Sequence, residues 1–375
     1  MNNLLKKLQH KHFIFIAILA ISFVASLLFV YNNHSFYDQS IAEVIEISSE
    51  DQTEVTDEHQ NEDVIYTQQL IAKLKNGESK GELVHLSNEY SGSGIYQPEF
   101  HIGDDLFISI DSSEDNGDLT GSIIDVKRDQ SLLLVAWIFI FVLMAIGRRQ
   151  GIFAIISLLV NAALIAYALD IYINTADASL LFIMSIVVII MTAVSLLLIS
   201  GFNEKTYAAI VSTTLGTFAL LFITMFVLWL TNEQGLRFEE MAFLTRPPQA
   251  IFMAGVLVGA LGAVMDVGVT MSSSLFGLYE KNHHISFKDL KASGLEIGKD
   301  IMGTMTNILF FAYVSGTIPT LLLYFLNDVT LGFTLSMNLS LELTRALAGG
   351  IGIVLTIPIG LYTTIFFINR KRAKL

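Results

Sequence analysis

Gly255-Val-Leu-Val-Gly-Ala-Leu-Gly-Ala-Val-Met-Asp266-Val-Gly-Val-Thr-Met-Ser-Ser-Ser274 is the stretch that decides the fold. It lies in an apolar run, 249–275, whose single charged residue is Asp266. A helix crosses the hydrocarbon of a bilayer with about 20 residues, at about 1.5 Å per residue. The run is long enough for that, and it predicts a transmembrane helix that carries one carboxylate.

Apolar runs of similar length recur along the chain, at 13–31, 131–147, 151–173, 179–202, 206–231, 301–326 and 346–368. Of the 375 residues, 53% are hydrophobic and 15% are charged, and the mean hydropathy is +0.59. A soluble chain of this length is less apolar, so the excess must face lipid. We predict an α-helical polytopic membrane protein with about eight transmembrane helices in a lipid bilayer.

The first run, 13–31, follows Lys6, Lys7 and Lys11 and has two interpretations. A cleaved signal peptide has an apolar region of roughly 7 to 15 residues, followed by a cleavage site of small residues. This run is longer than that and leads into Asn32 and Asn33. We therefore favour an uncleaved membrane anchor.

Between the first two runs, the pattern over 32–130 changes to short segments of alternating polarity, which indicates a small β-rich unit. The best strand candidates are 41–47, 65–73, 82–86, 105–110 and 122–126, with turn residues at Asn76-Gly77, Ser91-Gly-Ser-Gly94 and Asn116-Gly117. Five short strands favour a small barrel of the OB kind. The segment 48–63 is so acidic and polar that a loop is expected there.

The basic residues are unevenly distributed, and this predicts the topology. With the N-terminus inside, fourteen Lys and Arg fall in cytoplasmic segments, and only Arg237, Arg246 and Arg345 fall in short external loops. Cytoplasmic loops carry the excess of Lys and Arg in membrane proteins. Both termini are thus expected in the cytoplasm and residues 32–130 outside. There, 22 acidic residues face five basic ones, which argues against nucleic-acid binding.

Asp266 is the strongest candidate for a functional residue. A charged side chain in hydrocarbon costs on the order of 2.5 to 3.5 kcal/mol on insertion scales, and packing does not require one. Helical spacing places Gly259, Gly262, Asp266 and Thr270 on one face, with Gly255 one turn earlier. Small residues let another helix approach, so we expect the glycines to serve helix packing. The carboxylate is expected in the cytoplasmic half of the membrane.

The following apolar run begins with a related pattern over 298–307, Gly-Lys-Asp-Ile-Met-Gly-Thr-Met-Thr-Asn. Asp300, Gly303, Thr304 and Asn307 lie on one helical face, where Gly303 is a further packing candidate. Asp300 could instead complement the dipole at a helix N-terminus. Because consecutive spans run in opposite directions, the two carboxylates are expected at similar depth, in a shared polar pocket.

Three residues in other runs are expected to shape the helix bundle. Asn161 is expected to donate a hydrogen bond to a neighbouring helix. Pro319 and Pro358 are expected to kink or break the last two helices, as happens at many transport sites. Kinks also occur in inert helices, so this indication is weak.

The chain lacks the usual residues for several kinds of cofactor site. It has no cysteine, and its eight histidines all lie outside the apolar runs. Thiolate sites are thereby excluded, and imidazole ligation of haem or zinc between helices is not expected. No nucleotide-binding motif is present, and we expect no cofactor.

Four motifs carry a resemblance to a known family. They are 259–274, the stretch Ile297-Gly-Lys-Asp-Ile-Met-Gly-Thr-Met-Thr-Asn307, Gly147-Arg-Arg-Gln-Gly151 and Gly201-Phe-Asn-Glu-Lys-Thr206. Together they resemble the YibE/F family of bacterial multi-span membrane proteins, over roughly residue 131 to the C-terminus. The extra first helix and external domain make the chain similar to the longer, YibE-type member.

The resemblance implies a bacterial plasma membrane and a shorter paralogous membrane protein as partner; a second copy of this chain is the alternative partner. It singles out Asp266, Asp300, Gly303 and Asn307. It implies no particular activity.

Three functions are therefore open. The first is a transporter or permease in which Asp266 and Asp300 carry a proton or a cation, with Asn307, Thr270 and Thr304 as neutral oxygen ligands, since oxygen ligands suit hard cations. The second is a non-catalytic component for assembly or sensing. The third is an intramembrane hydrolase, because two carboxylates can share a proton and activate water.

Overall fold

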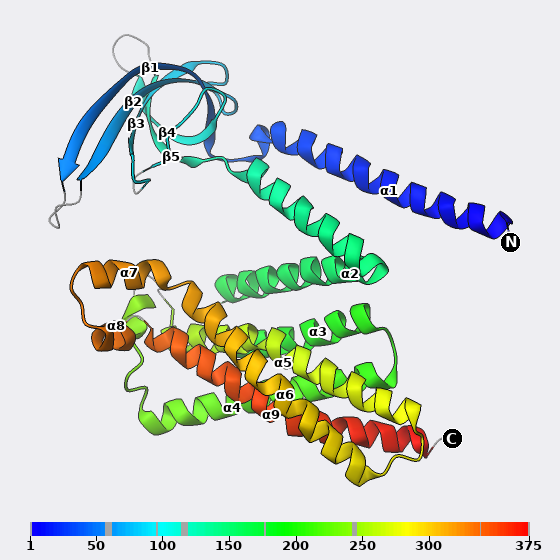
Figure 1. Ribbon diagram of the computed structural model, residues 1–375. Coiled ribbons are helices and arrows are strands. Elements are labelled where there is room, and N and C mark those ends of the chain that lie inside the picture. Colours follow the sequence, from blue (N-terminus) through cyan, green and yellow to red (C-terminus); the bar gives the residue numbers. More distant parts are fainter. Residues whose placement is uncertain are drawn as a thin grey trace. The chain divides into compact units, whose positions relative to one another are not determined.

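The computed structural model of the chain consists of two compact units, Met1–Leu143 and Met144–Leu375 (Figure 1). The structure describes residues 2–56, 62–94, 97–113, 119–175, 178–241, 246–337 and 339–373. Within these ranges, the side chains of 2–16, 49, 50, 112, 113, 239, 240 and 337 are not described. The first unit holds the five strands, and the second holds most of the helices.

The first unit is built around a closed barrel with the strand order β1-β2-β3-β5-β4. Its elements are α1 (Asn2–Tyr31), η1 (His34–Phe36), β1 (Ser40–Thr56), β2 (Glu62–Leu74), β3 (Leu83–Ser91), β4 (Asp105–Ser113), β5 (Leu119–Val126) and the beginning of α2. The strands pair antiparallel, except that β3 and β5 pair in parallel over three residues. The predicted small β-barrel is confirmed.

Alternation of side chains explains why these segments form a barrel. Along β3, exposed and buried residues alternate, so that Val84, Leu86 and Asn88 point inward. Apolar side chains from the other strands meet them, and Phe100 closes the interior with 1% of its surface exposed. Since a strand turns alternate residues to opposite faces, such a pattern buries one apolar face and hydrates the other.

The loop expected at 48–63 is wrong for the residues that the structure describes there, because β1 continues to Thr56 and β2 begins at Glu62; the other five residues, 57–61, lie outside the described ranges. Ser49 pairs with Gln69, and the pairing runs on to Thr56 opposite Glu62. Charged side chains on a strand that faces water do not oppose backbone pairing, so acidity alone did not indicate a loop. The predicted turns at Gly77 (φ 80°) and Gly94 (φ 74°) are confirmed, and the one predicted at 116–117 lies outside the described residues.

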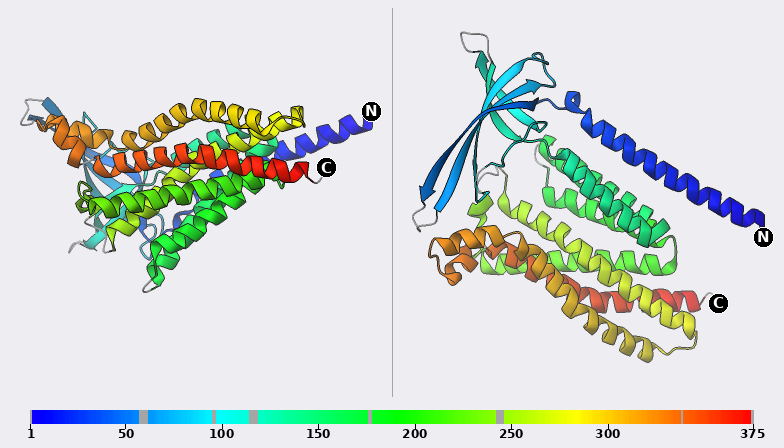
Figure 2. Two further views of the ribbon diagram at one scale, coloured as in Figure 1. Left: turned by 90° about the horizontal axis from the view of Figure 1, so that it is seen from below. Right: turned by 45° about the horizontal axis from the view of Figure 1, so that its top comes forward.

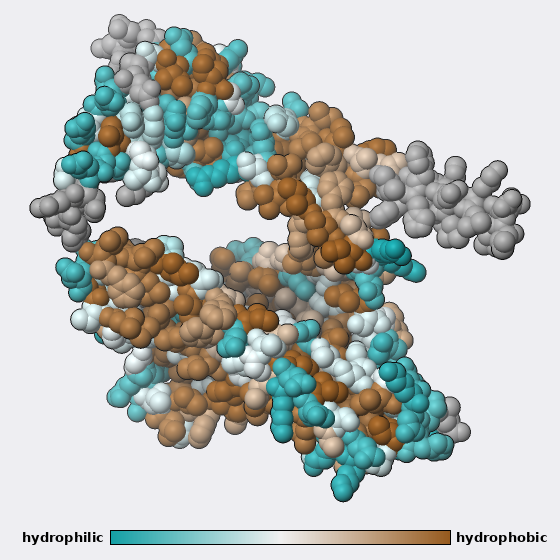
Figure 3. Space-filling view, viewed as in Figure 1, coloured by the Kyte–Doolittle hydropathy of each residue, from teal (hydrophilic) through white to brown (hydrophobic). Residues whose placement is uncertain are grey.

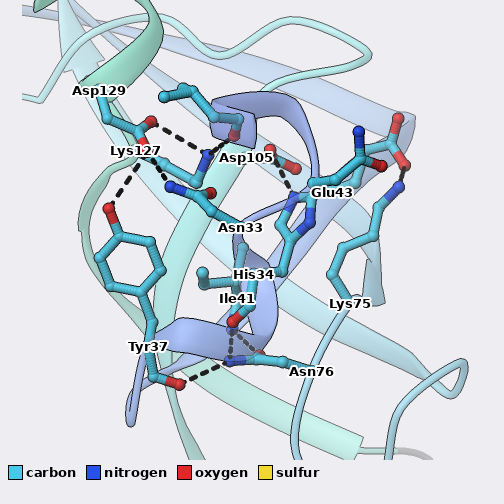
Figure 4. A network of polar contacts seen from close by, with 12 residues as sticks. Asn33, His34, Tyr37, Ile41, Glu43, Lys75, Asn76, Asp105, Lys127 and Asp129 are labelled. Carbon is cyan, nitrogen blue, oxygen red and sulfur yellow. Dashed lines mark hydrogen bonds and ion pairs between the residues drawn. The ribbon is translucent and has the colours of Figure 1, made fainter. Parts of the chain in front are cut away.

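Asn76 fastens the beginning of the barrel. Its Oδ1 accepts a hydrogen bond from the Ile41 amide (2.7 Å), and the two hydrogens of its Nδ2 are shared among the carbonyl oxygens of His34 (3.0 Å), Tyr37 (3.1 Å) and Gln39 (2.8 Å) (Figure 4). The side chain is buried. The side-chain amide of Asn76 therefore provides hydrogen-bond partners for backbone groups of the irregular segment that leads from α1 into β1.

The second unit is a bundle of helices, many of them strongly apolar. Its elements are the remainder of α2 (Asp129–Asn174), α3 (Leu180–Ser200), α4 (Glu204–Thr231), η2 (Phe238–Met241), α5 (Pro248–Lys281), α6 (Phe287–Ser315), α7 (Ile318–Leu326), α8 (Leu331–Met337) and α9 (Ser340–Arg372). Five helices, α2, α3, α4, α5 and α9, are long and apolar enough to cross a membrane. The pair α6 and α7, bent by 56°, makes a sixth if it counts as one span.

The predicted number of eight spans is not confirmed, for two reasons. The predicted runs 131–147 and 151–173 form the single helix α2, which is interrupted by non-helical dihedral angles at Arg148 (φ 47°, ψ −120°). The apolar part of α1 that the structure describes, Ala17–Tyr31, is shorter than the others.

The core of the bundle lies where α4, α5 and α9 pack together (Figure 2). Small residues make this close approach possible. A Cβ atom added at Gly216 would collide with the Thr356 hydroxyl, and one at Gly268 would lie 2.6 Å from Oγ1 of Thr213. Several hydroxyl groups in this core bond to their own helices, as when Thr356 Oγ1 donates to the Gly352 carbonyl oxygen (2.7 Å), whereas Thr213 Oγ1 and Thr364 Oγ1 have no partner among the described residues.

Asn161 and Pro319 behave as predicted. The Asn161 amide donates to Ser195 Oγ on α3 (2.8 Å), which also receives the Ser157 hydroxyl (2.9 Å). Pro319 stands in the first turn of α7, directly after the break at the end of α6. Pro358 lies inside α9, which continues through it.

The surface of the helical unit is suited to lipid. Large apolar side chains are exposed along it, among them Phe222, Trp229 and Leu347. Figure 3 shows hydrophobic side chains over α7 and α8, and hydrophilic ones gathered where α9 ends near the C-terminus. Such extensive exposed apolar surface in a helical unit indicates a multi-pass membrane protein.

We expect Asn76→Ala to loosen the barrel. The variant removes the side-chain partner of the Ile41 amide and of the Tyr37 and Gln39 carbonyl oxygens, at about 1–3 kcal/mol for each buried group that water cannot reach. Hydrogen–deuterium exchange of the full chain in detergent should show faster exchange in β1 and β2. Gln69→Ala removes only an exposed contact to Ser87, and it should leave the exchange pattern unchanged.

We expect Gly216→Ala to weaken the helical core. The added methyl group collides with Thr356, and overpacking of this kind costs about 1–3 kcal/mol. The temperature at which the detergent-solubilised protein aggregates should fall. Gly277→Ala is the matched control, because no heavy atom lies within 4 Å of its added Cβ. If both variants lower this temperature equally, the close contact between Gly216 and Thr356 does not stabilise the core.

Candidate functional site

Five residues of α5 form a continuous strip on the side of the helix away from its buried face. They are Gly255, Gly259, Gly262, Asp266 and Thr270, which we call the α5 strip. Gly259, Gly262 and Asp266 are exposed, and the other two are partly buried. The opposite face of α5 packs against α3, α4 and α9.

Side chains from two other helices cover the half of the strip that is nearer Pro248. Nε of Arg345, on α9, lies 3.7 Å from the position of a Cβ on Gly255. The Tyr313 hydroxyl, on α6, rests on Gly259 so closely that a Cβ there would collide with it. The first two glycines of the strip thus receive polar groups of neighbouring helices.

The strip is open at Gly262 and Asp266. No heavy atom lies within 4 Å of a Cβ built on Gly262. Asp266, one turn further, is exposed. It lies 18 residues after Pro248 and 15 before Lys281, where α5 begins and ends, so about 22 Å of helix follow it. Asp266 is therefore a mid-helix residue and does not stand at a helix terminus.

The predicted residues of α6 also lie on an exposed face. Asp300, Gly303, Thr304 and Asn307 are all exposed, and no heavy atom lies within 4 Å of a Cβ on Gly303. The Thr304 hydroxyl donates to the Ile301 carbonyl oxygen of its own helix (3.0 Å).

The opposite side of α6 packs on α9. A Cβ on Gly294 would collide with Leu361, and one on Gly298 would collide with Ile357. The packing of α6 on α9 therefore uses Gly294 and Gly298.

The structure places both carboxylates on exposed faces of the antiparallel neighbours α5 and α6. Among the described residues, neither Asp266 nor Asp300 has a hydrogen bond or an ion pair. Accessible carboxylates of this kind can bind a proton or, with hydroxyl and amide oxygens nearby, a hard cation. The assignment of Asp266, Asp300, Asn307, Thr270 and Thr304 to one binding site stays a prediction, as does the packing role of Gly262 and Gly303.

A second polar group in the helical unit was not predicted. Arg345 lies in the second turn of α9, and its predicted place in an external loop is wrong. Its guanidinium forms an ion pair with Glu342 and lies 5.3 Å from the centre of the Phe252 ring. Arg345 Nε and the Tyr313 hydroxyl are buried and have no hydrogen-bond partner among the described residues.

The spacing of Glu342 and Arg345 offered a signal for this group. Oppositely charged residues three apart face each other on a helix, so their pairing was predictable once a helix was assumed there. The contact with Tyr313 joins residues far apart in the sequence, and no local pattern indicates it.

Within the first unit, a polar clasp joins the barrel to α1 and to the beginning of α2 (Figure 4). The side chain of Lys127 is only 1% exposed. Its ammonium group lies 3.0 Å from the Asp129 carboxylate and donates a hydrogen bond to the Val30 carbonyl oxygen of α1 (2.9 Å). Asp129 also accepts from Asn33 (2.9 Å) and from the Tyr37 hydroxyl (3.1 Å). These residues, with Val30, form the clasp.

Two further contacts support the clasp. Partial burial, together with the hydrogen bond to the Asp129 carboxylate, raises the pKa of the Tyr37 hydroxyl, so it stays protonated and donates at neutral pH. His34 Nε2 lies 3.0 Å from the Asp105 carboxylate on β4. These contacts connect the beginning of β4 with the segment after α1 and with the beginning of α2.

Comparison with known families gives one match for the helical part of the chain and another for the barrel. Residues 135–370 match the family model described as YibE/F-like protein, and residues 35–126 match the YibE/F family N-terminal domain. No curated protein and no solved structure matches the chain. Because the first match alone spans more than half of the 375 residues, this multi-pass membrane protein belongs to the YibE/F family.

Proposed function

We propose that this protein is a membrane transporter in which Asp266 and Asp300 carry a proton or a hard cation. Thr270, Thr304 and Asn307 are proposed as neutral oxygen ligands beside them. The observation that carries the proposal is the exposure of Asp266 in the middle of an apolar 34-residue helix.

An ionised Asp266 cannot simply face lipid. The cost is on the order of 2.5 to 3.5 kcal/mol, and Gly262, its neighbour on the strip, offers no polar group in compensation. The carboxylate avoids this cost if it is protonated, if it binds a cation or if water reaches it. Each of these states is a step of a carrier cycle, so the residue that membrane insertion disfavours is the one that transport requires.

The hydrolase alternative is not supported by the geometry. A catalytic pair of aspartates shares a proton, which requires the two carboxyl groups to come within hydrogen-bonding reach. In the structure, Asp266 and Asp300 are both exposed and make no hydrogen bond to each other. Transport requires no such contact.

The sensing alternative has one observation in its favour, which is the clasp. Lys127 and Asp129 connect the barrel to α1 and to α2 through buried or half-buried contacts. A rigid connection of this kind would transmit ligand binding on the barrel to the membrane helices. Sensing and transport are compatible, since a barrel that binds a ligand could regulate a carrier.

The proposed topology has eight spans, both termini in the cytoplasm of a bacterium and the barrel outside its plasma membrane. It counts α1 as one span, α2 as two spans on either side of Arg148, and the pair α6 and α7 as one. A second copy of the chain, or a shorter paralogous membrane protein, is the proposed partner.

We expect Asp266→Asn to abolish ion-coupled flux. The amide cannot release a proton and binds cations weakly. The purified protein, reconstituted into liposomes that contain a pH-sensitive dye, would be challenged in turn with gradients of H⁺, Na⁺, K⁺, Mg²⁺ and Ca²⁺. Dissipation of a gradient by the native protein, and its loss in the variant, is the expected result.

Asp170→Asn is the matched control. Asp170 is also a helix carboxylate, but it is exposed near the end of α2 and bonded to Asn174 (2.8 Å). Its replacement should leave the flux unchanged. If Asp266→Asn transports as fast as the native protein, the carboxylate has no part in the mechanism.

We expect single cysteines to report the proposed topology, since the native chain has none. In intact cells, a membrane-impermeant maleimide should label Glu78→Cys on the barrel and spare His284→Cys between α5 and α6. In inside-out vesicles the pattern should be reversed. Labelling of both cysteines from the same side would refute the topology.

A further inference from the structure

The α5 strip is covered at one end and open at the other. Polar side chains lie over Gly255 and Gly259, whereas no described group of another helix comes within 4 Å of a Cβ built on Gly262, and Asp266 is exposed. In the proposed topology the covered end is external, because α5 begins there. The cover therefore stands between the external water and Asp266, on the face of the helix that Asp266 shares.

The covering groups are positioned by contacts on three helices. Arg345 on α9 is held by the Glu342 carboxylate of the same helix and by the Phe252 ring of α5. Tyr313 belongs to the last turn of α6, and its hydroxyl fits only because Gly259 has no side chain. The cover thus forms only when α5, α6 and α9 are close together at this end.

The cover is not held by hydrogen bonds to the strip. Arg345 Nε and the Tyr313 hydroxyl are both buried without a partner among the described residues. Each unpaired buried group costs about 1–3 kcal/mol. If the helices separate at this end, both groups reach water and recover that cost, which offsets part of the lost packing. The closed arrangement is therefore one from which opening is comparatively easy.

We infer that Tyr313 and Arg345 form a gate that closes the external end of the α5 strip. Closed, the gate leaves Asp266 accessible only from the cytoplasmic side; open, it admits external water and the transported ion. The inference rests on the proposed function, since a gate has a purpose only if Asp266 binds something that crosses. In this arrangement the absence of a side chain at Gly259 leaves room for the Tyr313 hydroxyl when the gate is closed.

The test uses Gly262→Cys, the residue of the strip directly inside the gate. It is suited to the purpose because the chain has no native thiol and an added side chain meets no atom there. A charged methanethiosulfonate reagent would be applied to intact cells and to inside-out vesicles. In the otherwise native chain, we expect labelling from the cytoplasmic side only.

The gate is then removed by Tyr313→Ala combined with Arg345→Ala in the Gly262→Cys chain. We expect the rate of labelling from outside to rise by roughly tenfold or more, as the population of open molecules increases. Labelling from the cytoplasmic side should persist, which shows that the variant is inserted and folded.

A matched control comes from a second tyrosine–arginine pair in the same unit. The Arg246 guanidinium lies 5.1 Å from the centre of the Tyr172 ring, at the end of α2. Tyr172→Ala combined with Arg246→Ala removes groups of the same kind from the same side of the membrane, and it should leave the external labelling of Gly262→Cys low.

Several results would overturn the gate. They are external labelling with the gate intact, no gain when the gate is removed, an equal gain in the control pair, or no labelling from either side. The last result would mean that lipid or a partner covers the strip. A failed gate leaves the flux measurement on Asp266→Asn untouched, so failure of the gate and failure of the transport proposal can be told apart.

Discussion

In a bilayer, a side chain that ionises or hydrogen-bonds must find its partner within the protein, in water or in a bound ion. Most polar groups of the helical unit obey this constraint locally. Asn161 and Ser195 bond to each other between helices, and Thr356 bonds to its own helix. Asp266 does not, because no described group pairs with it. The conflict between its position and its lack of a partner underlies the function proposed for the unit.

Glycines set how the helices meet, and they do so in two ways. Gly216 and Gly298 bring apolar or hydroxyl-bearing side chains into direct contact and so build the core. Gly259 instead makes room for a polar group, and no described group of another helix lies within 4 Å of a Cβ on Gly262. The same small residue therefore marks a packing contact, a polar contact or an open surface, and spacing along one helix does not distinguish among them.

What the sequence predicts well follows from local chemistry. Alternating polarity located all five strands, and apolar runs located the long helices, because each pattern reflects one face or one length. The acidic segment 48–63 was mistaken for a loop, since pairing with the rest of β2 decides its conformation. Asp266 could be found from the cost of its charge alone. Arg345 and Tyr313 could not be found as a pair, because only the packing of α6 and α9 on α5 brings them together.

Moving α6 away from α5 and α9 would cost a different free energy at each of its two ends. At its beginning, Gly294 and Gly298 pack against Leu361 and Ile357, and opening would expose apolar surface at about 25 cal/mol per Å² wherever water entered. At its end, opening would hydrate the unpaired Tyr313 hydroxyl. Only two residues separate Tyr313 from Gly316, the C-cap of α6, which stands before the 56° bend into α7. The break between α6 and α7 thus lies beside the contact that costs less to open, and in the proposed topology this end of α6 is the external one.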